Sequence, residues 1–126
     1  MGNRFITLVS NLLTRPSGFT SKDVSTCYKM VRGEIMRAIF NSLEATTNFG
    51  MEPEMTAKLS RYRKIGGEKL NSKDVDIYYK PRDLSAGKKI RWFKHGLETF
   101  FEILYFNNAS FIVEESYDGK KIKRKF

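Results

Sequence analysis

Most residues of this chain that could take part in chemistry are cations, and several of them stand beside aromatic rings. Lysine and arginine neutralise phosphate groups, and exposed aromatic rings can stack on the bases of single-stranded nucleic acid. Four stretches, residues 61–64, 80–82, 89–94 and 121–125, are rich in these residue types. The candidate nucleic-acid-binding residues that they contain are Arg61, Arg63, Lys64, Lys80, Arg82, Lys89, Arg91, Phe93, Lys94, Lys121, Lys123 and Lys125.

The charge balance favours the same class of partner. The 126-residue chain has 23 lysine and arginine residues against 14 acidic ones, which gives a formal net charge of +9. Such a surplus predicts a polyanionic partner, with nucleic acid first, an anionic membrane surface second and an acidic protein third. Bases occur in every part of the chain, so we expect a basic folded surface rather than one basic tail.

Groups typical of catalytic or metal sites are sparse. His95 is the single histidine and stands in a Lys-His-Gly stretch that resembles a surface turn. Asp74 and Asp76 could share one cation if they lay on a strand, because residues two apart face the same way. With so many bases available, these acids are better explained as ion-pair partners. The chain has no nucleophile motif, phosphate-binding loop or metal-ligand spacing, so we predict neither catalysis nor a cofactor.

Cysteine usage bears on the compartment. Cys27 is the only cysteine, so the chain cannot form an internal disulfide. This is typical of proteins in a reducing environment. The sequence therefore predicts an intracellular location, cytoplasmic or nuclear, rather than secretion, and its longest apolar run is too short to span a membrane.

The elements that must position these groups begin with a helix over residues 3–14. The apolar residues stand at i, i+3, i+4, i+7 and i+8, which forms one stripe of a helix: Phe5, Leu8, Val9, Leu12 and Leu13. We expect this stripe to pack on the core. The alternative is an amphipathic anchor at a membrane surface, which is disfavoured because the polar side carries little basic charge beyond Arg4.

Two more helical patterns follow. Apolar residues from Val24 to Leu43 recur at spacings of three and four, which predicts a long central helix that Thr20 or Ser21 caps and that ends near Gly50. A shorter pattern starts at Pro53, includes Met55 and Leu59, and stops at the glycines after residue 65.

The C-terminal part is expected to be a sheet. Residues 88–126 divide into four segments separated by the turn dipeptides His95-Gly96, Asn107-Asn108 and Asp118-Gly119, and residues 75–80 alternate as a further strand. Asp118-Gly119 is the strongest turn signal, because a type I′ turn requires positive φ at both positions. Residues 97–106 also show helical spacing, but their aromatic and β-branched content and the flanking turn dipeptides favour a strand.

Alternation along the last strand has a direct consequence for the charges. Ile122 is expected to face the core together with Lys120 and Arg124, which leaves Lys121, Lys123 and Lys125 on the opposite face. Acidic residues of the preceding strand, Glu114 and Glu115, should then lie across from bases.

Together these patterns predict one α+β domain over residues 1–126. Two to three N-terminal helices (residues 3–65) would pack on one face of an antiparallel β-meander of four to five strands (residues 74–126). The predicted function is nucleic-acid binding through a cationic and aromatic surface, without catalysis. The alternatives are a small protein-interaction or assembly module, including a viral one, that forms homo-oligomers, and a peripheral membrane or matrix-type protein.

Overall fold

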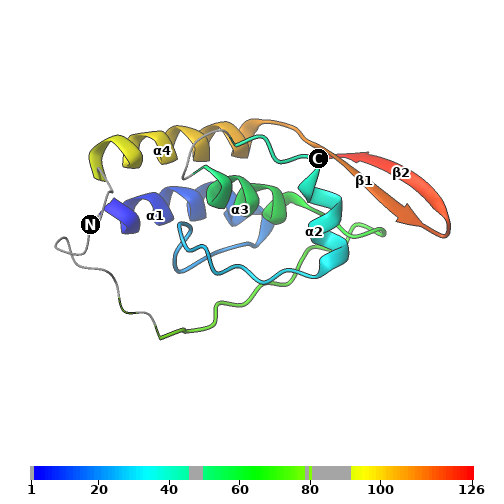
Figure 1. Ribbon diagram of the computed structural model, residues 1–126, viewed down its shortest axis with the longest axis horizontal. Coiled ribbons are helices and arrows are strands. Elements are labelled where there is room, and N and C mark those ends of the chain that lie inside the picture. Colours follow the sequence, from blue (N-terminus) through cyan, green and yellow to red (C-terminus); the bar gives the residue numbers. More distant parts are fainter. Residues whose placement is uncertain (1, 46–49, 79, 81–91) are drawn as a thin grey trace.

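The structure, a computed structural model, describes residues 2–45, 50–78, 80 and 92–126. Its helices are α1 (Gly2–Thr14), α2 (Gly33–Phe40), α3 (Met51–Arg61) and α4 (Trp92–Asn108), and a 3-10 turn, η1 (Arg15–Ser17), follows α1. Two antiparallel strands, β1 (Ile112–Tyr117) and β2 (Lys120–Lys125), come after α4. The described residues therefore form an α+β fold in which a hairpin follows the helices (Figure 1).

Helix α3 lies at the centre of this arrangement. Helices α1 and α4 run side by side, and α3 packs against both of them (Figure 1). Every residue of α3 from Pro53 to Ser60 is buried, including its polar ones. Helix α2 contacts β1, and the hairpin projects beyond the helices (Figure 1).

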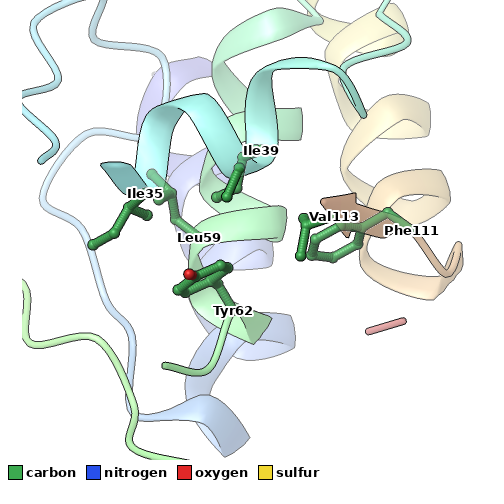
Figure 2. Packing of buried hydrophobic residues seen from close by; sticks show 7 residues of the cluster. Ile35, Ile39, Leu59, Tyr62, Phe111 and Val113 are labelled. Atoms are coloured by element: carbon green, nitrogen blue, oxygen red, sulfur yellow. The ribbon is translucent and has the colours of Figure 1, made fainter. Parts of the chain in front are cut away.

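The apolar core has two parts. The larger cluster joins α2, the end of α3 and the root of the hairpin, and Figure 2 shows its members Ile35, Ile39, Leu59, Tyr62, Phe111 and Val113. The smaller cluster joins α1, the segment after it and α4 through Ile6, Val24 and Ile103. The hairpin is thus anchored at its root, while the rest of it reaches into solvent.

An ion pair is buried in α3. The side chains of Glu54 and Lys58 are 0% and 3% exposed, and the Lys58 Nζ lies 2.6 Å from Glu54 Oε1. The two carboxylate oxygens accept the backbone N–H groups of Glu44 and Ala45, each at 2.7 Å, and the ammonium donates to the carbonyl of Ser42. Each buried charge therefore has several partners, as burial requires. The pair ties the segment after α2 to α3.

The predicted meander of four to five strands is wrong, because the described residues form two strands only. Residues 97–106 belong to α4, so the helical spacing of their apolar side chains prevails over a β preference that packing readily overrides. The side-chain amides of Asn107 and Asn108 donate to the carbonyls of Ile103 and Leu104 at 2.8 and 2.7 Å. These asparagines thus end a helix instead of forming a hairpin turn.

The other expected strands do not form in the described part either. Residues 75–78 and 80 are exposed and lack regular structure. Of the strand predicted over residues 88–94, only 92–94 are described, and they begin α4. The sheet therefore offers no broad face on which helices could pack.

Within the described residues, the long helix predicted from Thr20 or Ser21 to near Gly50 forms only at Gly33–Phe40. In the first part, Ser21 Oγ accepts the N–H of Asp23 at 3.3 Å, and Asp23 Oδ1 accepts the N–H of Ser25 at 2.9 Å. Such local bonds compete with the helical hydrogen bonds of the backbone. The helix predicted from Pro53 is confirmed as α3.

Helix α1 is confirmed, but the predicted packing of its apolar stripe is wrong. Phe5, Leu8 and Leu12 are 59%, 57% and 58% exposed. The side that packs on the protein contains the buried residues Ile6, Thr7, Ser10 and Thr14, and Val9 of the predicted stripe also packs against the smaller cluster. The periodicity identifies the helix correctly, yet the side turned to the core is largely polar.

Candidate nucleic-acid interface

Local turn chemistry sets the geometry of the hairpin. Asp118 and Gly119 adopt φ values of 50° and 72°, the positive values that a type I′ turn requires. The pairing register runs from Tyr117 opposite Lys120 at the turn to Ile112 opposite Lys125 at the root. The predicted final strands and their turn are therefore confirmed.

One face of the hairpin, which we call the outer face, carries the lysine row. Lys121, Lys123 and Lys125 are exposed on β2, and their partners on β1 are Ser116, Glu114 and Ile112 respectively. The Lys123 Nζ lies 2.8 Å from Glu114 Oε1. This hydrogen bond raises the pKa of Lys123 and lowers that of Glu114. Three bases face one acid on this surface, so it remains cationic.

The opposite, inner face holds the hairpin in place. Arg124 binds the carboxylate of Glu115 through Nε at 2.9 Å and Nη2 at 2.6 Å, and its Nη1 donates to the carbonyl of Lys64 at 3.3 Å. The guanidinium also lies 5.5 Å from the ring centre of Tyr62.

Tyr62 completes the inner-face contacts by donating its hydroxyl hydrogen to the Glu115 carboxylate. Burial, together with this hydrogen bond, raises the pKa of Tyr62 to about 12. The phenol is therefore neutral at physiological pH. These contacts engage Arg124 within the protein, whereas the lysines of the outer face stay exposed and only Lys123 among them pairs with an acid of the same face.

The spacing of the row suits an extended polyanion. Alternate residues of a strand are about 6.8 Å apart, so the row spans about 14 Å. One strand of DNA carries a phosphate for every ~3.4 Å along the helix axis, so about four phosphates fall within that span. Lysine side chains are long and flexible enough to reach them. The major groove of B-DNA also admits a two-stranded β-ribbon.

The candidate bases at the end of α3 are engaged in the protein's own structure. Arg61 donates to the carbonyls of Phe106 and Ala109 at 2.8 and 2.6 Å, and burial lowers its pKa. Arg63 donates to the carbonyls of Ser60 and Tyr62, each at 2.9 Å. Lys64 pairs with Glu68 at 2.9 Å. The bond from Arg124 to the Lys64 carbonyl brings this cluster next to the hairpin root.

The remaining candidates lie apart from the hairpin. Lys80 is exposed in an irregular segment. Phe93 is 66% exposed in the first turn of α4, and Lys94 beside it lies 3.9 Å from Glu98. The last three candidates fall outside the described residues: Arg82, Lys89 and Arg91. Phe93 is thus helical and does not lie in the strand predicted over residues 88–94.

The acidic pair considered as a metal site has another partner. Asp76 forms an ion pair with the Lys22 ammonium at 2.9 Å, and Asp74 accepts the Lys22 backbone N–H at 3.1 Å. Among the described residues, no three metal-ligating side chains gather in one place. His95 lies in the first turn of α4 with its Nδ1 3.2 Å from Glu98 Oε2.

Sequence reasoning missed the apolar side chains exposed on α1 and α4. Leu97, Phe101 and Tyr105 of α4 are 45%, 63% and 59% exposed. Their spacing of four residues was visible in the sequence, but it was interpreted as part of a strand. Sequence reasoning likewise missed the Glu54–Lys58 pair, whose spacing of four residues is the signal for a helical ion pair.

No protein-family model matches the chain, and neither the curated proteins nor the solved structures include one with significant similarity to it. Within the described ranges, no helix combines the length and the apolar character that crossing a membrane would require.

Proposed function

We propose that the protein binds nucleic acid through the outer face of its hairpin, with the phosphate backbone as the main target. The observation that carries this proposal is the exposed row of Lys121, Lys123 and Lys125 on a ribbon that projects from the helical body (Figure 1). The net charge of +9 adds long-range attraction toward any polyanion.

Contacts between lysines and phosphates hold the nucleic-acid backbone but recognise little of the base sequence. Base reading in a single strand needs exposed rings, and the residues of the outer face are aliphatic, polar or charged. Phosphate contacts position a protein on nucleic acid without selecting a sequence. We therefore expect similar affinity for oligonucleotides of different sequence, and we expect binding to weaken as salt is raised.

A protein-interaction or assembly role is the second candidate. The apolar side chains that α1 and α4 expose to solvent favour it, because monomers rarely leave a contiguous apolar patch of several hundred Å² uncovered. A peripheral membrane role is the third candidate. An intracellular location, cytoplasmic or nuclear, remains a prediction from the lone cysteine.

Replacing Lys121, Lys123 and Lys125 together by glutamine tests the proposal. The change should weaken binding to every labelled oligonucleotide alike and flatten the salt dependence by up to about three charges, because each lost phosphate contact removes about one from the log–log slope. Fluorescence anisotropy at several salt concentrations measures both quantities.

The matched control replaces Arg15, Lys22 and Lys73 by glutamine. These three residues are exposed bases outside the hairpin. This variant loses the same net charge, so it should lose only the long-range part of the attraction. If both triple variants lost affinity equally, the outer face would have no special role. If neither lost any, phosphate binding by the hairpin would be excluded.

A further inference from the structure

The neighbouring helices α1 and α4 together expose a set of apolar side chains. We call it the helical apolar face, and it consists of Phe5, Leu8, Leu12 and Leu13 on α1 with Leu97, Phe101 and Tyr105 on α4. These side chains are between 38% and 63% exposed. With about 200 Å² per side chain, within the 150–250 Å² of an aromatic residue, seven residues that are roughly half exposed together present on the order of 700 Å² of surface. The largest patch of a typical monomer is about 300–600 Å².

Aromatic contacts join the two helices across this face. The ring of Phe5 on α1 stacks on that of Phe100 on α4, with centroids 6.2 Å apart and an angle of 21°. Phe100 in turn meets Phe101 edge to face at 5.7 Å. These ring contacts connect the exposed side of α1 with that of α4, and the two helices run side by side (Figure 1).

The outward orientation of α1 is fixed by well-satisfied contacts on its other side. The Thr14 hydroxyl donates to the Phe19 carbonyl at 2.8 Å, and Thr7 Oγ1 accepts the N–H of Val24 at 3.3 Å. Turning Leu8 and Leu12 inward would break these bonds and bury unpaired polar groups. The apolar stripe must therefore be covered from outside if it is covered at all.

We infer that a second copy of the chain covers the helical apolar face, so that the protein is a symmetric homodimer. A standard interface buries about 800 Å² on each partner, close to the apolar area that this face offers. A two-fold axis lets one face pack against its own copy, and two helices from each chain then form a four-helix layer. Phe5, Leu8 and Leu12 also have the i, i+3, i+7 spacing of a helix–helix seam.

The distribution of charge favours a second copy over a lipid surface. Helices that lie on membranes typically carry lysine and arginine along the polar border of their apolar side. Arg4 is the only base within α1, and Lys94 of α4 faces Glu98 at 3.9 Å. The row of exposed lysines Lys121, Lys123 and Lys125 lies on the hairpin, which projects away from α1 and α4 (Figure 1). Charged and apolar surfaces are thus separate, as they would be for two different partners.

Salt separates this inference from the proposed function. Two chains of charge +9 repel each other, and screening of that repulsion should strengthen the dimer as salt is raised. The affinity for nucleic-acid phosphates, in contrast, should fall as salt is raised. Either proposal can therefore fail while the other holds.

Sedimentation equilibrium of the full chain, from roughly 1 to 100 µM, is the test, since standard-size interfaces dissociate at micromolar concentrations or below. We expect twice the monomer mass, with a larger dimer fraction at higher salt. Leu8→Gln with Phe101→Gln should raise the dimer dissociation constant about tenfold or more while the circular dichroism spectrum stays that of the folded chain. The control replaces Met30 and Val75, which are 101% and 74% exposed outside the face, by glutamine.

Three results would overturn the inference. The first is a wild-type chain that stays monomeric throughout the concentration range. The second is a dimer that the double variant and the control weaken equally. The third is a monomer that floats with anionic phosphatidylserine vesicles and loses this binding in the double variant, which would assign the face to lipid. The salt dependence of the wild-type chain keeps the test decisive if the double variant fails to fold.

Discussion

Replacing Lys58 with methionine is expected to lower the free energy of unfolding by about 3–5 kcal/mol, because the change leaves a buried carboxylate without its cation. Glu54 is fully buried, and the Lys58 ammonium lies 5.8 and 5.4 Å from the ring centres of Phe106 and Phe111. Water therefore cannot take the place of the lost ammonium. Urea unfolding followed by circular dichroism measures the change.

Lys64→Met provides the matched control for Lys58→Met. Lys64 also pairs with a glutamate four residues away, Glu68, but the two side chains are 40% and 72% exposed. An exposed pair typically contributes only about 0.2–1 kcal/mol. Adding Glu54→Gln to Lys58→Met should recover part of the loss, since it removes the unpaired charge. A Lys58→Met variant as stable as the control would contradict the buried pair.

The second large effect is expected for Ile103→Ala, which should cost about 2–5 kcal/mol through lost burial and the cavity left behind. Ile103 is fully buried against Ile6 and Val24 in the smaller apolar cluster. Phe101, two residues earlier in α4, is 63% exposed. Phe101→Ala should therefore cost less than about 1 kcal/mol although it removes more atoms.

This pair of variants also distinguishes a helix from a strand. Residues two apart share a face of a strand, so a strand would make the two substitutions costly together. In a helix they point in different directions. Thermal unfolding at the lowest practical protein concentration makes the comparison, since dimer formation would add stability through Phe101. Equal losses for the two variants would contradict α4 as described.

Elements fixed by local chemistry could be predicted from the sequence. Asp118-Gly119 tolerates the positive φ values of its turn, so both strands of the hairpin, the lysine row and the cross-strand pair of Glu114 with Lys123 follow from it. Helix α3 likewise follows from Pro53 at its start and the glycines after it.

Features that depend on distant parts of the chain could not be predicted. The periodicity of residues 3–14 defines a helix but does not say which side meets α3 and α4. Residues 97–106 are compatible with both a strand and a helix, and tertiary packing stabilises the helix. The candidate site shows the same dependence on distant residues. Arg61 donates to carbonyls more than forty residues away along the chain, and its local sequence does not predict these hydrogen bonds.

The central claim, that the outer face of the hairpin contacts phosphate, is tested most directly by amide chemical shifts of the isotope-labelled full chain during titration with an oligonucleotide. We predict that the largest changes occur at Lys121, Lys123 and Lys125 and at their cross-strand partners Glu114 and Ser116. We also predict that they fade as salt is raised. Changes concentrated on other segments, or none at low salt, would contradict the account.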